Sequence, residues 1–192
     1  SPELECRRCH SEIRAGDVSY KPGPGATRDE RDMKVRRRSS ISVQEVPSNR
    51  SLYKNLINIV GDRWTANIIA LSFHGLSRFD QFHQELPVAT NILADRLRLL
   101  VEEGVFEQTP YQQRPPRYDY HLTPKGEDLF PWFLTLLQWG DRWCDPDKRG
   151  KPMSLSHTSC GKALHGQVRC SECNGVLKAR EVKFSLGQDS AA

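Results

Sequence analysis

The sequence predicts an α+β fold in which a helical domain with a β-hairpin is joined to a small cysteine-rich module. Three observations support it. Apolar residues recur at helical spacing between positions 57 and 101, and residues typical of strands flank a proline turn after Gly104. Two Cys-x-x-Cys pairs lie near the two ends of the chain. At 192 residues, one core of about 100 residues with a satellite module is expected.

The first helical region is interrupted at Gly61, a residue suited to ending a helix. Its apolar residues recur at helical spacing: Ile57, Val60, Trp64, Ile68 and Leu71. Asp62 is expected to cap the helix after the break, because its carboxylate can accept the free amides of Trp64 and Thr65. A short corner between two helices is therefore predicted here.

Two more helices are predicted downstream. Ser77 is expected to cap the first, which Pro87 cannot continue, and its apolar residues are Phe79, Phe82 and Leu86. The second covers residues 89–103 and ends at Gly104. Its buried stripe consists of Leu93, Leu97, Leu100 and Val101. Its remaining face and flanks are polar: Thr90, Asn91, Asp95, Arg96, Arg98 and Glu102. Such a face can lie in a DNA major groove, which admits a helix and presents distinguishable base edges.

A hairpin and a last helix complete the domain. Residues 105–111 and 117–122 are predicted strands, and the turn between them is cationic because Arg114 and Arg117 flank two prolines. Thr123 is expected to cap the last helix, with Pro124 at its first position. Its apolar stripe is longer than a small domain needs, which predicts burial against a second subunit: Leu129, Phe133, Leu136, Leu137 and Trp143. Its aromatic residues could instead line an effector pocket.

This order of elements is typical of a winged helix-turn-helix with an additional dimerisation helix, and residues 50–145 resemble the HxlR family, MarR-like transcription regulators of bacteria. The shared runs include Val60-Gly-Asp-Arg-Trp64, Leu93-Ala-Asp-Arg-Leu97, Arg114-Pro-Pro-Arg-Tyr118 and Leu122-Thr-Pro-Lys-Gly126. The resemblance implies a homodimer that binds a palindromic operator in double-stranded DNA. It places on the DNA-facing helix Thr90, Asn91, Asp95, Arg96 and Arg98, and on the wing at 111–118 Arg114 and Arg117.

The sequence departs from the family at one position. Many members that sense oxidants or electrophiles carry a cysteine just before the first helix, where this chain has Ser51. A hydroxyl group cannot supply the low-pKa thiolate that such sensing requires. Redox or aldehyde sensing at Ser51 is therefore not expected.

The charge distribution limits how DNA could be bound. The chain has a net charge of +4, but residues 49–145 hold 10 Lys or Arg against 12 Asp or Glu, a net charge of −2. DNA binding must therefore use locally placed cations: Arg78, Arg96, Arg98, Arg114 and Arg117. No recognisable catalytic motif is present, so no enzyme activity is predicted. No stretch approaches the roughly 20 apolar residues of a membrane span, and no signal sequence opens the chain, which predicts a cytoplasmic protein.

The cysteines predict a metal site. Cys170 and Cys173 form a tight knuckle that can present two thiolates to one ion, and His157 and Cys160 lie one short loop upstream. These four residues are expected to hold a structural Zn²⁺ in a zinc-ribbon-like tail, with His165 as a substitute for His157. The alternatives are free thiols or a disulfide between the two knuckle cysteines.

An internal repeat relates the two ends of the chain. The segment from Cys6 and Cys9 to Gly23 aligns without gaps to the segment from Cys170 and Cys173 to Gly187. The favoured interpretation is that residues 1–23 are the remnant of an upstream copy, which would make this chain the second half of a tandem protein. The two copies of such a protein could pair within one chain in place of the homodimer. Cys6 and Cys9 would then form a second metal site with a neighbouring knuckle, or remain incompletely coordinated.

The predicted domains are therefore the remnant knuckle at 1–23, a partly disordered basic linker at 24–48, the winged helix-turn-helix domain at 49–145, the tail at 146–187 and a disordered end at 188–192. The predicted function is a sequence-specific DNA-binding transcription regulator, with or without a small-molecule effector. The alternative is a zinc-ribbon adaptor whose winged helix contacts proteins instead of DNA.

Overall fold

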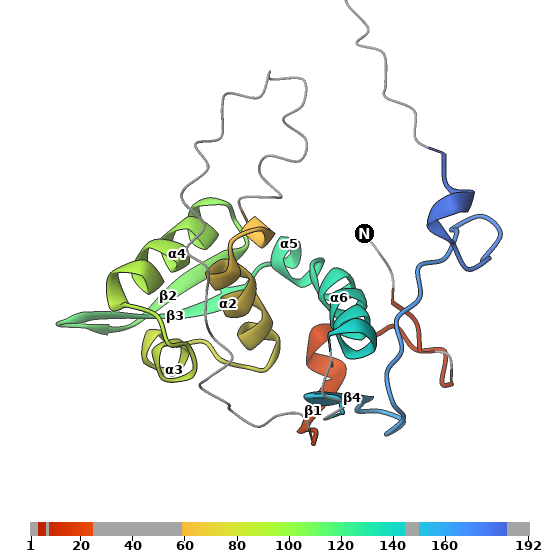
Figure 1. Cartoon of the computed structure of the whole chain (residues 1–192). Helices are drawn as coiled ribbons and strands as arrows, with labels where there is room; N and C mark the ends of the chain where they lie inside the picture. Colours follow the sequence, from red (N-terminus) through yellow and green to blue (C-terminus); the bar gives the residue numbers. More distant parts are fainter. Residues whose placement is uncertain (1–3, 7, 25–58, 145–149, 184–192) are drawn as a thin grey trace, which may run out of the picture.

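The computed structural model describes residues 4–6, 8–24, 59–144 and 150–183. The winged domain, with its hairpin projecting at one side, occupies one end of the molecule, and the cysteine-rich segments from both ends of the chain lie at the other (Figure 1). Ile57, Ser51, most of the predicted linker and the end at 188–192 lie outside the described residues. No helix in the described parts of the chain is long and apolar enough to cross a bilayer.

Helix α2 (Arg63–Phe73) begins at the predicted cap. One carboxylate oxygen of Asp62 accepts the amides of Trp64 and Thr65 at 3.0 and 3.1 Å. Thr65 is fully buried, and its hydroxyl donates to the Ile59 carbonyl, which ties α2 to the turn before it. The predicted helix corner at residues 61–62 is confirmed.

Helix α3 (Phe79–Glu85) begins differently from the prediction. Its N-cap is Arg78, and the Gln81 side chain accepts the amides of both Ser77 and Arg78 at 3.0 Å. The Ser77 hydroxyl lies instead 3.5 Å from a carboxylate oxygen of Asp119. The predicted Ser77 cap was wrong because the helix begins one residue later, with Arg78 as its N-cap, and the Ser77 hydroxyl lies against Asp119 instead of the helix amides.

Helix α4 (Thr90–Glu102) follows α3 after a four-residue turn and completes a helix-turn-helix. Leu93, Leu97 and Leu100 are fully buried, as the predicted stripe requires. Gly104 follows with φ +67°, a left-handed conformation that glycine adopts without a Cβ clash, and it ends the helix.

The hairpin consists of β2 (Phe106–Gln113) and β3 (Pro116–Leu122), which pair antiparallel from Phe106 with Leu122 to Gln113 with Pro116. Its base is held to the rest of the domain, because the Tyr120 amide donates to the Ser77 carbonyl at 2.7 Å. The hairpin is therefore a wing fixed to the start of α3.

The single last helix of the prediction is divided into α5 (Pro124–Glu127) and α6 (Phe130–Trp143). Thr123 caps α5 as predicted, by accepting the Gly126 amide at 3.2 Å. The division follows from Pro131, which has no amide to donate and whose ring clashes with a preceding helical carbonyl. A proline is tolerated in a first helical turn, so a new helix begins at Phe130.

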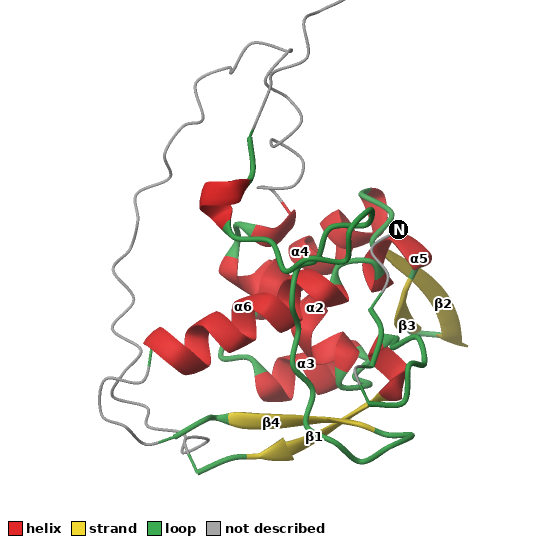
Figure 2. Ribbon diagram, turned by 90° about the vertical axis from the view of Figure 1, so that its right-hand side faces the viewer, coloured by secondary structure: helices red, strands yellow, loops and turns green. Residues whose placement is uncertain are grey.

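The segments from the two ends of the chain form a second sheet that the sequence did not predict. Strand β1 (Val18–Pro22) pairs antiparallel with β4 (Met153–His157), so that Val18 lies opposite His157 (Figures 1 and 2). Short 3₁₀ helices precede β1 (η1, Ala15–Asp17) and lie near the end of the described chain (η4, Ala179–Glu181). The ring of Tyr20 on β1 lies 3.7 Å from that of His74 at the end of α2, which joins this sheet to the winged domain.

Candidate DNA-binding surface and metal centre

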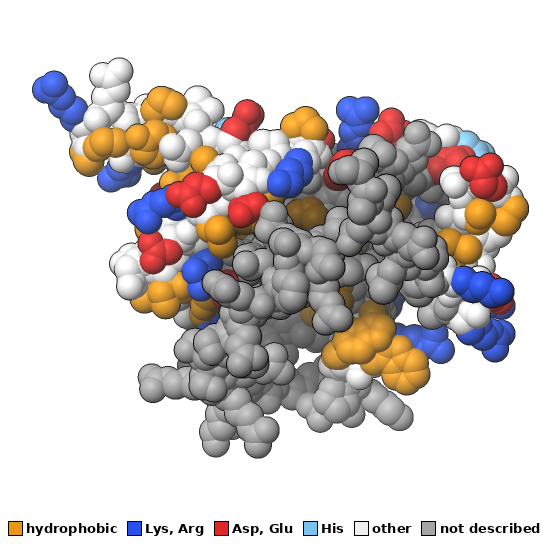
Figure 3. Space-filling view, turned by 90° about the horizontal axis from the view of Figure 1, so that it is seen from above, with side chains coloured by type: hydrophobic (Ala, Val, Ile, Leu, Met, Phe, Trp, Pro, Cys, Tyr) orange, Lys and Arg blue, Asp and Glu red, His pale blue; other side chains and the backbone are white. Residues whose placement is uncertain are grey.

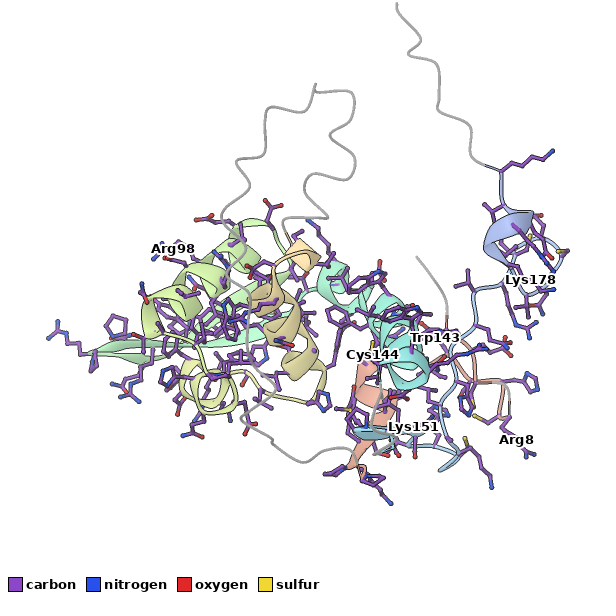
Figure 4. All side chains as sticks on the ribbon, viewed as in Figure 1. Arg8, Arg98, Trp143, Cys144, Lys151 and Lys178 are labelled. Atoms are coloured by element: carbon purple, nitrogen blue, oxygen red, sulfur yellow. The ribbon has the colours of Figure 1, made fainter. Side chains whose placement is uncertain are left out.

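The outer face of α4 carries most of the predicted DNA-facing residues. Thr90, Asn91, Asp95 and Arg98 are exposed, and Figure 4 shows Arg98 projecting from the side of α4 away from the core. Arg98 and Asp95 form an ion pair of 3.3 Å along the helix. Because both ends of this pair are open to solvent, it can separate at little cost to present Arg98 to another partner.

Arg96 is placed differently from the other predicted residues. Its guanidinium nitrogens lie 3.0 and 3.3 Å from the two carboxylate oxygens of Asp62, and its side chain is 34% exposed. Burial raises the pKa of Asp62, but the hydrogen bonds from Arg96 and from the helix amides outweigh it and hold that pKa below its ordinary value. Arg96 thus joins α4 to the cap of α2. The prediction placed its guanidinium on the DNA-facing side of α4, but this group is paired with Asp62.

The wing brings two further cations to the same surface. Arg114 and Arg117 are exposed at the tip, and the projecting end of the molecule carries Lys and Arg side chains in Figure 3. The Gln112 side chain donates to the Arg114 carbonyl at 3.1 Å and braces the turn. The wing tip is therefore a short cationic arm.

Arg78 connects the helix-turn-helix to the wing. Its Nε lies 3.1 Å from Asp119 of β3, and its guanidinium lies 4.6 Å above the Tyr111 ring of β2. The neighbouring Asp119 carboxylate raises the pKa of Arg78, which keeps the cation charged. Arg78 is half exposed, so it fixes the wing and still offers charge to the surface.

A second candidate site lies between the two ends of the chain. The side chains of Cys6, Cys9, His157 and Cys160 converge, with one ligand atom from each within 4.8 Å of all the others. Sulfur Sγ of Cys6 lies 3.7 Å from that of Cys160, and Nδ1 of His157 lies 3.4 Å from Cys9 Sγ and 3.5 Å from Cys160 Sγ. For metal–sulfur bonds of about 2.3 Å, a tetrahedron has edges of about 3.8 Å between sulfurs and slightly less to nitrogen. The cluster could therefore hold a metal ion.

The electrostatics of this cluster favour thiolate at one ligand. The Ser11 hydroxyl, 3.1 Å from Sγ, and the Ser11 amide lower the pKa of Cys9 to about 6. At Cys160 the Lys162 amide lowers the pKa, but burial and the adjacent Cys6 sulfur together raise it above its ordinary value. A cation placed among the four side chains would remove this mutual repulsion of the sulfurs.

The predicted ligand set is divided by the structure. His157 and Cys160 are together as predicted, but the two cysteines beside them are Cys6 and Cys9, and Cys170 and Cys173 lie in a separate lobe. The regrouping has a physical cause, since the β1–β4 pairing carries the N-terminal cysteines to the end of β4. The internal repeat in the sequence could have indicated this grouping. It makes the pair Cys6 and Cys9 equivalent to the pair Cys170 and Cys173, so either pair could join His157 and Cys160.

Helix α6 exposes a continuous apolar stripe. The side chains of Trp132, Leu136, Trp139 and Trp143 are between 39% and 64% exposed and recur at helical spacing. A hydrophobic patch is visible in Figure 3 in the part of the surface where α6 lies in Figure 1. Contiguous apolar surface of this kind marks a protein interface more often than free surface.

Comparison with known proteins agrees with this architecture. The profile of the HxlR-like helix-turn-helix family matches residues 59–148. The HTH-type transcriptional regulator Rv3095 of Mycobacterium tuberculosis is 39% identical over 126 residues, which cover 66% of this chain and 79% of the relative. The regulator YvaP of Bacillus subtilis is 32% identical over 95 residues, which cover 49% of this chain and 88% of YvaP. The chain belongs to the HxlR-like helix-turn-helix family, whose members are transcription regulators and not enzymes.

Solved structures give the same class. PA1607 superposes with a TM-score of 0.59 at 33% identity, covering 77% of this chain and 99% of that protein. PA1374 of Pseudomonas aeruginosa superposes with a TM-score of 0.52 at 30% identity, covering 71% of this chain and 92% of that protein. Both proteins carry the assignment of transcription factor. The predicted winged helix-turn-helix fold is confirmed.

Proposed function

We propose that this protein regulates transcription by binding a specific DNA sequence, with α4 in the major groove and the wing on the adjacent backbone. The observation that carries the proposal is the combination of an exposed polar face on α4 with exposed Arg114 and Arg117 on the wing tip. Side chains at the start of a recognition helix contact base edges, whereas cations on a wing contact phosphates.

Selection from a library of random duplexes tests this proposal. We expect enrichment of one motif, bound in 150 mM salt at least about 10³-fold more tightly than unselected duplex. The Arg98→Ala variant should weaken binding to that motif, and Arg14→Ala is the matched control, because Arg14 is an exposed arginine of the N-terminal segment paired with Glu12. Failure to enrich any motif would refute sequence-specific DNA binding.

A protein-interaction function is the competing proposal, and one observation favours it. Asp95 is exposed beside Arg98 on the face that would enter the groove, and the surrounding domain has a net charge of −2 from 10 basic and 12 acidic residues at 49–145. Binding to duplex that disappears at moderate salt, with no motif enriched, would support the adaptor instead.

We also propose that two copies associate through the α6 stripe. A two-fold axis along α6 would bury its tryptophans and present two α4 helices to successive major grooves, about 34 Å apart. A palindromic operator would follow from that symmetry. The selected motif tests this point, since a dimer predicts two inverted half-sites.

For the Cys/His cluster we propose a structural Zn²⁺ held by Cys6, Cys9, His157 and Cys160. Three thiolates and an imidazole are ligands that zinc prefers, and four protein ligands leave no open position for a substrate or water. Elemental analysis of protein purified without added metal should find roughly one zinc per chain. Less than about half an equivalent would rule the site out.

A further inference from the structure

The C-terminal lobe repeats the fold of the segment that supplies Cys6 and Cys9. We call residues 4–18 the N-terminal knuckle and residues 168–182 the C-terminal knuckle; residue numbers differ by 164 at every equivalent position. The Cys6 amide donates to the Ser11 carbonyl at 2.9 Å, and the Cys170 amide donates to the Gly175 carbonyl at 2.9 Å. The sequence repeat is therefore also a repeat of backbone structure.

Further backbone contacts recur at the same offset. The bridge between Glu5 and Glu12 corresponds to the bridge between Arg169 and Val176. The left-handed residue after the second cysteine is His10 with φ 58° in one knuckle and Asn174 with φ 55° in the other. Each knuckle also continues into a 3₁₀ helix, η1 or η4. Two segments with the same hydrogen bonds and the same turn can present their cysteines in the same way.

The two knuckles differ in what covers them. In the N-terminal knuckle, Ile13 and Val18 are 6% and 7% exposed because they pack in the core cluster that contains Leu155 of β4. Their counterparts Leu177 and Val182 are 38% and 37% exposed. The C-terminal knuckle therefore exposes the side chains that its twin buries.

The surface that covers the N-terminal knuckle is one short segment. We call Met153–Cys160 the β4 half-site: it pairs with β1, its Thr158 amide donates to the Asp17 carbonyl at 2.8 Å, and it supplies the ligands His157 and Cys160. Within residues 4–18, the contacts to the half-site come from backbone groups, apolar side chains and cysteines, and Cys6, Cys9, Ile13 and Val18 have cysteine or apolar counterparts in the C-terminal knuckle.

We propose that the β4 half-site is a shared receptor on which the C-terminal knuckle of the same chain can replace the N-terminal knuckle. The exchanged state would hold one metal ion with His157, Cys160, Cys170 and Cys173. It would bury Leu177 and Val182 in place of Ile13 and Val18, and it would release residues 4–22 from the module. The inference rests on the metal site proposed above and not on DNA binding.

Chain connectivity permits this exchange. Nine residues, 161–169, separate Cys160 from Cys170. Nine extended residues reach about 30 Å. The four ligand atoms of the present cluster lie within 4.8 Å of one another, so this reach is ample for Cys170 to take the place of a cysteine beside Cys160. The N-terminal knuckle is joined to the half-site through residues 10–156, and a longer loop costs more entropy to close. Binding of the C-terminal knuckle to the half-site therefore costs less loop-closure entropy than binding of the N-terminal knuckle.

Metal stoichiometry of paired variants tests the proposal. The variants are C6S/C9S, C170S/C173S and all four substitutions together, and Cys144→Ser is the control because Cys144 is exposed at the end of α6, outside both knuckles. We expect the wild type, the control and both double variants each to bind one Co²⁺, with the absorption of a tetrahedral thiolate site. The fourfold variant should bind none.

Four outcomes would overturn the inference. The first two are a C6S/C9S protein or a C170S/C173S protein that binds no Co²⁺. The third is a wild type that binds two ions. The fourth is a C6S/C9S protein that binds its ion only in a particle of twice the wild-type mass, which would mean that knuckles are exchanged between chains. If the wild type itself binds no metal, the proposed zinc site fails as well. Hydrogen exchange provides the second readout: in C6S/C9S the amides around Leu177 should gain protection and those at residues 8–24 should lose it.

Discussion

Two arginines two residues apart on α4 have different surroundings, because their side chains leave the helix on roughly opposite sides. Arg96 makes two hydrogen bonds to Asp62 and is one-third exposed, whereas Arg98 pairs only loosely with a neighbour on its own helix. The same residue type on the same helix therefore serves stability at one position and surface charge at the other.

The first prediction separates these two roles. Arg96→Ala should lower the free energy of unfolding by about 1 kcal/mol, because it breaks a partly screened ion pair that joins α4 to the α2 cap. Arg98→Ala should leave stability within about 0.5 kcal/mol and weaken binding to the selected duplex by roughly 1 to 3 kcal/mol. Urea denaturation and fluorescence anisotropy measure the two effects. Equal stability of the two variants would contradict the assignment of Arg96.

The pH dependence of stability gives a second prediction. The pKa of Asp62 is lowered from its ordinary value of 3.8, so its contribution is present above that pH and is lost as pH falls through the lower folded value. The difference in urea midpoint between wild type and Arg96→Ala should therefore shrink below pH 3.8. A difference that persists unchanged at pH 3 would mean that the Arg96 side chain stabilises through packing alone.

At the scale of single elements, the proposed function assigns phosphate contacts to the wing and sequence specificity to α4. Removing Arg114 or Arg117 should weaken binding to all duplexes similarly and reduce the salt slope of the binding constant by about one unit each. Arg14→Ala should leave the slope unchanged. Titrations at several salt concentrations check this, and a loss confined to the selected motif would place these arginines on bases instead.

Helix α6 carries the prediction about assembly. Trp139 is 56% exposed at the middle of the apolar stripe, so Trp139→Glu should place a charge in the proposed interface and convert the dimer to a monomer at micromolar concentration. Gln84→Glu, at an exposed position on α3, is the control for added charge. Light scattering measures both. An unchanged mass for Trp139→Glu would exclude the stripe as the interface.

Elements could be predicted from the sequence where one local rule dominates. The Asp62 cap, the α4 stripe and the Gly104 stop each depend on neighbouring residues, and each is observed. The prediction failed where two local rules compete. Serine is a good cap, but the helix begins one residue later at Arg78, whose amide donates to the Gln81 side chain, and the apolar stripe continues past Pro131 although the helix does not.

At the scale of the whole molecule, the site that could not be predicted depends on contacts distant in sequence. The residue types and the H-x-x-C and C-x-x-C spacings predicted a tetrahedral metal site, but two equivalent knuckles fit the same pattern. Only the β1–β4 pairing decides which knuckle is in place, and strand pairing over more than 130 positions leaves no local signal.

Chelation gives the last prediction. Removing the metal should speed hydrogen exchange in residues 4–24 and 150–183, because these segments have few apolar residues and depend on the ion to fold. Helices α2 to α4 should stay protected at 25 °C, since they bury many leucine, isoleucine and phenylalanine side chains of their own, although Ile13, Val18 and Leu155 belong to the same apolar cluster. Loss of protection in α4 together with the two ends would show that the chain folds as one unit.

The pairing of β1 with β4 also closes a long loop of the chain. Every residue from 10 to 156 lies between the two halves of the proposed metal centre, so an ion bound there would close a loop that contains the entire winged domain. In the chain-entropy account, a permanent tie around a loop of about 150 residues destabilises the unfolded state by about 5 kcal/mol, and a reversible tie by less. An ion bound there would therefore stabilise helices that it does not contact, and the melting temperature of the winged domain with and without metal would measure how strongly the loop is closed.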